Sequence, residues 1–185
     1  MDLGLKGKVA IVTGGSDGIG KAAAISMASE GAKVAIVGRT QEKLNAAVSE
    51  IKNTSGGDVI GVAADVSVES DVKAMVDKVV GEFGQLDILV NNAGTSSATT
   101  LEKMTDEDLK VDFGIKVYGA VYCARAALPH LKKSGAGAIV NTTTPGGKAP
   151  NPGGQPTSLS RAAGISLTKS WAGELAKDNI RVNTV

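Results

Sequence analysis

Short runs of β-branched and other apolar residues alternate with longer runs rich in Ala, Leu, Lys and Glu along the whole chain. The apolar runs are nearly continuous, which is typical of strands buried on both faces of a parallel sheet. Strands are predicted at residues 8–13, 33–38, 59–64, 86–91, 137–143 and 180–185. Helices are predicted between them, near residues 18–31, 40–54, 68–84, 104–133 and 157–178. Repeated strand–helix–strand units with right-handed crossovers predict an α/β protein with a doubly wound parallel sheet in three α/β/α layers.

The composition favours a globular domain over a membrane-spanning or nucleic-acid-binding chain. Of the 185 residues, 42% are hydrophobic and 21% are charged, and the net charge is +1 with both signs interspersed. We therefore expect a single domain, residues 1–185, with no nucleic-acid partner, no membrane span and no metal site. The N-terminus lacks the order of a signal peptide, and the single cysteine, Cys123, excludes an internal disulfide. These features predict a cytoplasmic protein.

A glycine-rich segment, TGGSDGIG at residues 13–20, follows the first predicted strand and opens the first predicted helix. Glycines let the backbone turn tightly and approach a pyrophosphate, and the helix that follows presents free N–H groups and its positive dipole end. This position between strand and helix favours dinucleotide binding over a purely structural turn. The residues predicted to bind the cofactor in this segment are Gly14, Ser16, Gly18, Ile19 and Gly20.

The residue after the second predicted strand bears on the choice of cofactor. An acid there would bind the ribose 2′-hydroxyl of NAD, whereas an arginine suits the 2′-phosphate of NADP. The residue is Arg39, so NADP(H) is the predicted cofactor, with help from the Ser16 hydroxyl, and NAD(H) is possible. Asp17 argues the other way, because its charge would lie near the same phosphate. A surface role for Arg39, with its stem lying along apolar neighbours, is the alternative.

The alternation of predicted strands and helices is interrupted at residues 145–156, PGGKAPNPGGQP. Four of the five prolines lie here, so the segment is predicted to be a loop. It follows the fifth predicted strand, at the carboxyl edge of the sheet, where ligands bind in such folds. Both a rigid connector and a wall of a substrate pocket fit this loop.

Three motifs resemble the short-chain dehydrogenase/reductase family, in the family's order. TGGSDGIG matches its TGxxxGxG loop, Asp65-Val66 stands where its adenine-contacting pair ends the third strand, and Asn91-Asn92-Ala93-Gly94 matches its NNAG motif. The resemblance runs from about residue 6 to residue 185 and is similar to the 3-oxoacyl carrier-protein reductase and sugar or steroid dehydrogenase branch. It implies a Rossmann fold with strand order 3-2-1-4-5-6 and an oxidoreductase. Asp65 and Val66 would bind the adenine, and Asn92 and Gly94 would pass close to the cofactor.

The resemblance also implies a catalytic set of Ser, Tyr and Lys with an Asn on the fourth helix. In the family the Tyr hydroxyl transfers the proton, the Lys lowers the Tyr pKa and holds the nicotinamide ribose, and the Ser polarises the substrate oxygen. Alignment on IVN at 139–141 and on AALP at 126–129 gives the register. The corresponding positions carry Thr144, Thr157, Arg161 and Lys116.

These replacements differ in their expected effect. Thr144 keeps a hydroxyl, and Arg161 keeps a charge that can hold the ribose. Thr157 offers an aliphatic alcohol, whose pKa is far above that of a phenol, in place of a phenol with a pKa near 10, so proton transfer through it is strongly disfavoured. Lys116 is either a desolvated lysine that replaces the acid or a surface lysine on an amphipathic helix. Tyr118, Tyr122 and His130 are weaker candidates.

Three functions therefore remain open. The first is an NADP(H)-dependent oxidoreductase that transfers hydride between the nicotinamide and a carbonyl or alcohol through an atypical active site. The second is a catalytically silent NADP(H)-binding sensor or partner subunit. The third is a structural component of an oligomer that has lost the cofactor, against which the intact glycine segment argues.

Two further expectations concern the rest of the protein. In the family the helices corresponding to 104–133 and 157–178 form a dimer face, so the resemblance implies a homo-oligomer. The chain stops at Val185, inside the predicted sixth strand, where family members continue with a Pro-Gly turn, a substrate lid and a seventh strand. The C-terminal part is thus expected to be missing, and the small-molecule substrate is not defined by the sequence.

Overall fold

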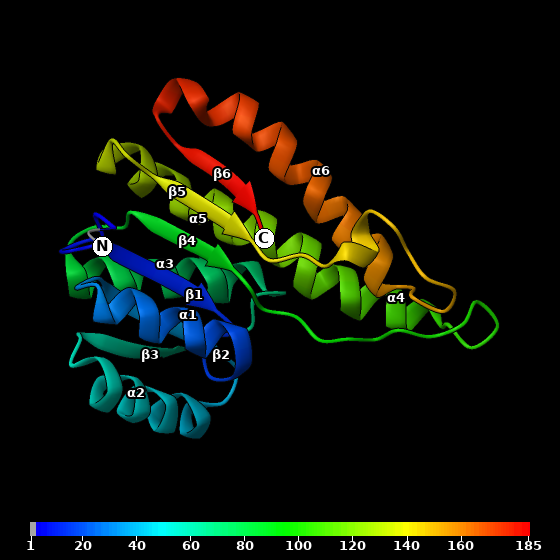
Figure 1. The fold of residues 1–185 in the computed structure, drawn as a ribbon, viewed down its shortest axis with the longest axis horizontal. Coiled ribbons are helices and arrows are strands. Elements are labelled where there is room, and N and C mark those ends of the chain that lie inside the picture. The colour runs from blue at the N-terminus through cyan, green and yellow to red at the C-terminus, as the bar shows by residue number, and fades with distance from the viewer. Residues whose placement is uncertain (1–2) are drawn as a thin grey trace.

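One six-stranded parallel sheet runs through the middle of the molecule (Figure 1), and the computed structural model describes residues 3–185. The strands follow the predicted ranges closely: β1 (Val9–Thr13), β2 (Lys33–Gly38), β3 (Val59–Ala63), β4 (Ile88–Asn91), β5 (Ala138–Asn141) and β6 (Arg181–Thr184). Their order in the sheet is β3-β2-β1-β4-β5-β6 with every neighbouring pair parallel, which confirms the predicted doubly wound fold. The order reverses between β1 and β4, which is where ligands bind in folds of this kind.

Helices cover both faces of the sheet. On one face lie α1 (Gly18–Ser29) and α2 (Gln41–Ser55), and on the other α3 (Glu69–Phe83), α4 (Asp106–Phe113), α5 (Gly119–Ser134) and α6 (Thr157–Leu175). The chain also makes two short 3₁₀-helical turns, at Pro145–Gly147 and at Ala176–Asp178. Among the described residues, no helix combines the length and the apolarity needed to cross a bilayer.

The helix predicted over 104–133 is not one regular helix. It begins at Asp106, because Thr105 caps it: the Thr105 hydroxyl accepts from Asp108 N, and the Asp108 carboxylate accepts from Thr105 N. Between α4 and α5 the chain makes a π-helical turn, η1 (Gly114–Tyr118), that carries Lys116. Such turns are rare and frequently lie at functional sites.

The sequence pattern of the strands reflects burial on both sides. All five residues of β1 are buried, and Ile11 and Ile36 have no exposed surface at all. Ile11 packs in the core on the α3–α5–α6 side, and Ile36 in the core on the α1–α2 side. This burial explains the nearly continuous apolar runs and fixes the carboxyl ends of the strands as a rigid edge.

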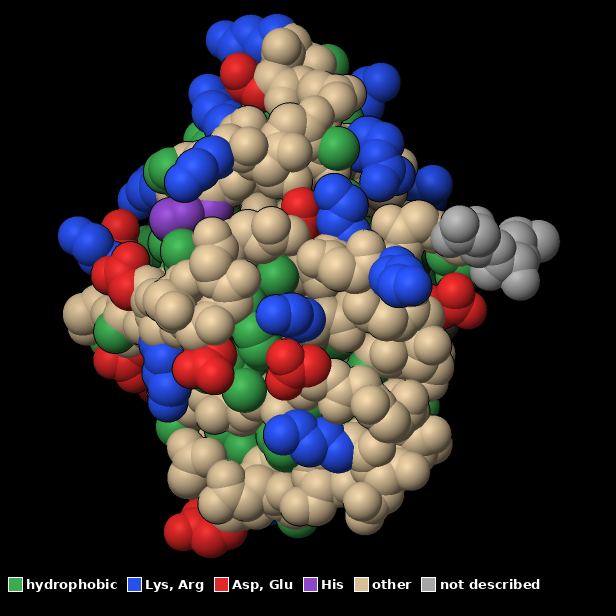
Figure 2. All heavy atoms as spheres, turned by 90° about the vertical axis from the view of Figure 1, so that its left-hand side faces the viewer, with side chains coloured by type: hydrophobic (Ala, Val, Ile, Leu, Met, Phe, Trp, Pro, Cys, Tyr) green, Lys and Arg blue, Asp and Glu red, His purple; other side chains and the backbone are tan. Residues whose placement is uncertain are grey.

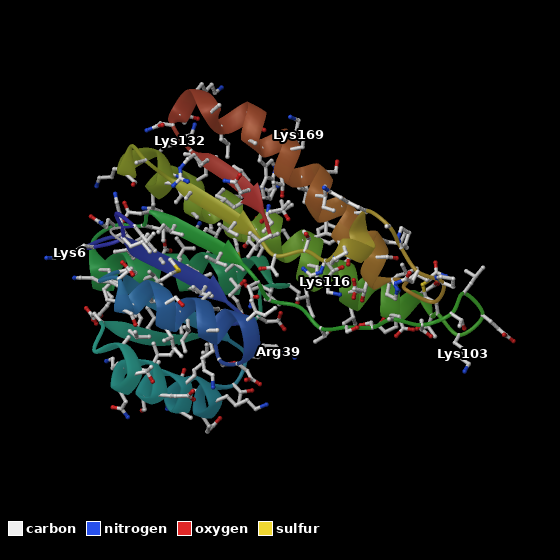
Figure 3. All side chains as sticks on the ribbon, viewed as in Figure 1. Lys6, Arg39, Lys103, Lys116, Lys132 and Lys169 are labelled. Carbon is white, nitrogen blue, oxygen red and sulfur yellow. The ribbon has the colours of Figure 1, made fainter. Side chains whose placement is uncertain are left out.

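The two edges of the sheet differ. Figure 2 views the molecule from the side of the strands' amino ends, where Lys and Arg side chains lie interspersed with Asp and Glu. The loops that carry the candidate site residues leave the opposite, carboxyl edge. Figure 3 shows Arg39 and Lys116 toward that carboxyl edge, and Lys6 and Lys132 away from it.

Candidate functional site

The glycine segment forms a tight loop between β1 and α1. Gly14 N donates to Val37 O at 2.8 Å, and Gly14 has a left-handed backbone with φ of 65°. A Cβ at Gly15 would lie 2.7 Å from Ile36 Cβ, and one at Gly20 would collide with the Gly14 carbonyl oxygen. These positions need glycine, because the loop backbone packs directly on β2 and on itself.

The first turn of α1 has free amides beside this loop. The helix is capped by Asp17, whose carboxylate accepts from Gly18 N at 2.7 Å. The first backbone bond of the regular helical pattern runs from Lys21 N to Asp17 O, so the amides of Ile19 and Gly20 precede it and suit an anion. The Ile19 side chain is 71% exposed. Asp17 thus has a capping role, which the sequence analysis did not anticipate.

A hollow of about 210 Å³, called here the wide hollow, opens at the carboxyl ends of β1 to β4. It brings together residues from the glycine loop, the ends of β2 and β3, and the NNAG segment. Its polar and glycine lining includes Gly14, Ser16, Arg39, Lys43, Asp65 and Gly94. Val66 lines it as well. Gly18, Ile19, Gly20 and Asn92 are not part of this lining.

Arg39 is exposed at the end of β2, and among residues 3–185 it has no carboxylate within ion-pair distance. Asp65 accepts hydrogen bonds through Oδ1 from Ser67 Oγ at 2.6 Å and Ser67 N at 2.9 Å. The Ser67 hydroxyl lowers the pKa of Asp65, and the charge of Arg39 acts in the same direction. Lys43, in the first turn of α2, adds a second cation that the sequence analysis missed. The wide hollow therefore offers two cations and one carboxylate.

The NNAG segment braces the loop. Asn92 Nδ2 donates to Thr13 O at 3.0 Å and to Gly14 O at 3.2 Å, and the Thr13 hydroxyl accepts from Asn92 N and Ala93 N. Asn91 Nδ2 donates to Asn141 Oδ1 at 2.9 Å, which joins β4 to β5. These asparagines hold the glycine loop and the central strands in register.

A second group of side chains, called here the lysine cluster, consists of Asp112, Lys116, Thr157 and Arg161. Lys116 Nζ donates to Asp112 Oδ2 in a buried ion pair, with 1% of the lysine side chain and none of the aspartate side chain exposed. Lys116 Nζ also donates to Thr157 Oγ1 at 3.2 Å. Burial lowers the pKa of Lys116, Asp112 acts against this shift, and Arg161 adds to it. Lys116 is therefore a buried lysine and not a surface residue.

The Thr157 hydroxyl has no hydrogen-bonding capacity left. It accepts from Ser97 N at 3.1 Å and from Lys116 Nζ, and it lies 3.3 Å from Asp112 Oδ2, to which it donates. A hydroxyl has one donor and two acceptor sites, and all three are occupied. Together with the Thr99 N to Gln155 O bond of 2.8 Å, this ties the loop after β4 to the start of α6.

Arg161 folds inward from α6. Its Nη1 donates to Thr142 O, while its Nε is buried without a partner. A Cβ at Gly94 would lie 3.0 Å from Arg161 Nη2 and 3.2 Å from Lys116 Cε, so the absence of a side chain at Gly94 lets both cations pack on the end of the NNAG segment. The hollow beside them measures about 20 Å³, about enough for a single water molecule.

The remaining candidates lie outside this cluster. Thr144 is exposed at the end of β5, and its side chain makes no capping hydrogen bond. Tyr118 is 56% exposed, with its ring 6.2 Å from that of Tyr122. Tyr122 and His130 line a groove between α3 and α5, and the Pro/Gly loop 145–156 lines neither hollow at the carboxyl edge.

Asp112 is a further site residue, besides Lys43, that the sequence analysis missed. It lies four positions before Lys116, a spacing that places both on one side of a regular helix. Acid–lysine pairs at this spacing are common on exposed helices, so the spacing alone did not indicate a buried pair.

Comparison with known proteins identifies the family. The family model for short chain dehydrogenases matches residues 8–185. A 3-oxoacyl-[acyl-carrier-protein] reductase, FabG of Thermotoga maritima, is 37% identical over 181 residues, which cover 98% of this chain and 73% of that protein. FabG of Staphylococcus aureus is 39% identical over 179 residues, 96% of this chain and 72% of that protein. The chain belongs to the short-chain dehydrogenase family of NAD(P)-dependent oxidoreductases.

Solved structures agree with this assignment. L-sorbose reductase from Gluconobacter frateurii, complexed with NADPH and L-sorbose, superposes with a TM-score of 0.95 and 39% identity, covering all of this chain and 70% of that one. An NAD⁺-bound xylitol dehydrogenase superposes with a TM-score of 0.93 and 34% identity, covering 97% of this chain and 69% of that one. Relatives that bind either dinucleotide thus share this fold.

Proposed function

We propose that this chain binds NADP(H) in the wide hollow and transfers hydride between the nicotinamide and a carbonyl or alcohol group of a small molecule, through an atypical active site. The observation that carries the cofactor preference is Arg39: an exposed guanidinium that lines the hollow and has no carboxylate partner among residues 3–185. A 2′-phosphate would bind it and the neighbouring Lys43. A relative that binds NADPH supports the same choice; NAD(H) remains a second ligand for the site.

The residues present fit such a dinucleotide. The glycines of the Gly14–Gly20 loop let its backbone turn tightly, and the amides at the start of α1 suit the pyrophosphate. Asp65 has one carboxylate oxygen engaged by Ser67 and the other available for an adenine amino group, beside Val66. When bound, a reduced nicotinamide supplies hydride to a carbonyl carbon. Gly94 lies between the wide hollow and the lysine cluster, so the reacting end belongs beside Lys116.

Lys116 is the proposed proton donor. An ammonium has three N–H donors, of which Asp112 and Thr157 take two. The third can give its proton to the carbonyl oxygen as hydride reaches the carbon, which leaves an alcohol and a neutral amine that regains a proton from water. Arg161 adds a second positive charge that favours negative charge developing on that oxygen. In this proposal Arg161 also contacts the ribose, and Thr144 polarises the substrate.

Catalytically silent NADP(H) binding is the second candidate function. It is favoured by the state of Thr157, whose hydroxyl is fully engaged by Ser97, Lys116 and Asp112. It is also favoured by the small volume beside Arg161. In that case the chain would be a sensor or a partner subunit of an active relative.

NADPH binding and turnover distinguish these functions. NADPH fluorescence would be titrated first, and a panel of carbonyl compounds would then be screened for oxidation of the bound cofactor. We expect turnover in the natural chain, its loss in Lys116→Met and in Asp112→Asn/Lys116→Met, and its retention in the control Lys110→Met, which removes an exposed lysine from α4. NADPH binding without turnover across the panel would favour the silent function. Turnover that survives in the double variant would exclude Lys116 as the acid.

We also propose a homo-oligomer through α5 and α6. Partly buried apolar side chains of both helices line a common groove, among them Leu128 and Trp171. Burial of such a groove against a second copy would stabilise a dimer. Sedimentation equilibrium on the full chain should give at least a dimer, and a pure monomer at all concentrations would refute this.

A further inference from the structure

Asp112 directs one of its carboxylate oxygens to the rest of the lysine cluster. Its Oδ2 accepts from Lys116 Nζ and from Thr157 Oγ1, whereas its Oδ1 is buried without a partner. No other cation among residues 3–185 forms an ion pair with it. The carboxylate therefore forms hydrogen bonds with the amine and the hydroxyl alone among the described residues, and its charge also favours the charged form of Arg161.

Asp112 is also the group that favours the charged form of Lys116. Removal from water disfavours an ammonium, and a buried charge persists only when it is paired. Two charged groups act on Lys116: Asp112 from α4, which favours the ammonium, and Arg161 from α6, which disfavours it. Without Asp112, burial and Arg161 would act in the same direction and favour the neutral amine.

The Asp112–Lys116 ion pair lies beside the wide hollow. Lys116 lies in the π-helical turn η1, and its stem packs on the bare backbone of Gly94, with Cε 3.2 Å from the place of a Cβ there. Gly94 also lines the wide hollow. The amine is thus held next to the site proposed for the cofactor, by a carboxylate that approaches from α4 and a hydroxyl that approaches from α6.

We propose that Asp112 is a positioning residue that keeps Lys116 protonated and aims it, together with Thr157, so that one N–H remains for a substrate oxygen. This inference rests on the proposed role of Lys116 as the proton donor. Asp112 itself does not touch substrate or cofactor. The proton moves from Lys116 Nζ to the substrate oxygen, and Asp112 keeps the site electrically balanced before that step.

The inference is tested first without substrate or cofactor. The side-chain amine of Lys116 would be followed by ¹⁵N NMR across pH in the full chain, with Lys116→Gln used to assign the signal. In Asp112→Asn the titration midpoint should fall by about one to two pH units, because the lysine keeps its burial and loses its counter-charge. Asp106→Asn, the same change at an exposed acid of α4, should leave the midpoint unchanged. Equal midpoints in Asp112→Asn and in the natural chain would overturn the proposal.

Turnover supplies an independent readout. The rate of a single turnover in carbonyl reduction should fall above the pKa of Lys116, and this alkaline limb should move to lower pH in Asp112→Asn by the same amount as the NMR midpoint. A limb that does not move would overturn the positioning role. Absence of turnover in the natural chain would refute the proposed function instead, and the NMR titration would still decide whether Asp112 controls Lys116.

A second variant covers the case in which Asp112→Asn does not fold. Asp112→Glu keeps the negative charge and displaces it by one methylene. The NMR midpoint should then stay close to that of the natural chain, while the rate of proton transfer falls because the ammonium is displaced. A rate equal to that of the natural chain would show that the position of the carboxylate is irrelevant and would overturn the proposal.

Discussion

The wide hollow and the lysine cluster lie side by side at the carboxyl edge of one sheet, and they are built in opposite ways. The wide hollow is lined by glycine backbone, by buried apolar side chains such as Val37, and by the exposed cations Arg39 and Lys43, which have no ion-pair partner among the described residues. The lysine cluster consists of buried or half-buried side chains that contact one another or the backbone, namely Asp112, Lys116, Thr157 and Arg161. Groups in the hollow are thus free for a ligand, whereas groups in the cluster also hold the fold together.

Substitutions in the wide hollow should therefore weaken ligand binding without changing the free energy of unfolding. Substitutions in the lysine cluster should change the free energy of unfolding as well. The largest effect is expected in the cluster. Lys116→Met leaves the Asp112 carboxylate buried without its counter-charge and should lower the free energy of unfolding by about 3–5 kcal/mol. Asp112→Leu/Lys116→Met removes both charges and should recover most of this loss. Urea unfolding measures the free energy of unfolding of the single and the double variant. Equal destabilisation in both would show that the unpaired Asp112 charge is not the cause of the loss.

Arg39→Ala tests the wide hollow. Loss of a charged hydrogen-bonding partner should weaken NADPH by about 10- to 100-fold, with much less effect on NADH, which has no 2′-phosphate. Because Arg39 is exposed and forms no ion pair with any described residue, the unfolding midpoint should not change. Arg181→Ala, at another exposed arginine that forms no ion pair with any described residue, is the control. An equal loss for both dinucleotides would remove the 2′-phosphate role.

Asp87 lies at the opposite edge of the sheet, so its substitution should change the stability of the fold and leave NADPH affinity unchanged. Its buried carboxylate accepts from Val9 N at 2.8 Å, Ser134 Oγ at 2.6 Å and Lys8 Nζ at 3.2 Å. Burial opposes its ionisation, but these donors outweigh burial and lower the pKa of Asp87. The stabilisation is therefore present above the carboxyl pKa of the unfolded chain, about 4, and is lost as the pH falls through the lower folded value.

Asp87→Asn should accordingly cost about 1–3 kcal/mol near neutral pH and progressively less as the medium is acidified. Thermal unfolding at several pH values measures this, with Asp77→Asn, at an exposed acid of α3, as the control. NADPH affinity should stay the same in both variants. A cost that does not depend on pH would contradict the role assigned to the carboxylate.

The smallest effect is expected for Thr157→Val, which removes a hydroxyl and keeps the shape of the side chain. The bonds that Thr157 accepts from Ser97 N and Lys116 Nζ and the bond that it donates to Asp112 are lost, and about 1 kcal/mol of stability should be lost with them. NADPH binding should not change, because Thr157 does not line the wide hollow. Destabilisation as large as that of Lys116→Met would mean that Thr157, and not the ion pair, holds the cluster together.

The sequence predicts the wide hollow far better than the lysine cluster. Strands, glycine turns and the residue after β2 are local features, so the positions of Gly14 and Arg39 follow from patterns within a few residues. Thr157, in contrast, lies 45 residues from Asp112, and their contact depends on how α4 packs against α6. No local pattern indicates such a contact.

The π-helical turn and the burial of Lys116 in it are likewise not indicated by the local sequence pattern. A regular helix was expected through residues 104–133, and the spacing of Asp112 and Lys116 on it resembles that of an exposed ion pair. The burial of Lys116 is decided instead by its packing on Gly94 and by its contact with Thr157. Side chains from distant parts of the chain set this environment, so only the folded structure identifies Asp112 as part of the site.

Dinucleotide binding at the wide hollow is measured by calorimetric titration of the full chain with NADPH and with NADH. We expect saturable binding of both, with NADPH tighter by about 10-fold or more because only NADPH has a 2′-phosphate to contact Arg39. If folded protein gave no heat of binding with NADPH or with NADH, the wide hollow would not be a dinucleotide site.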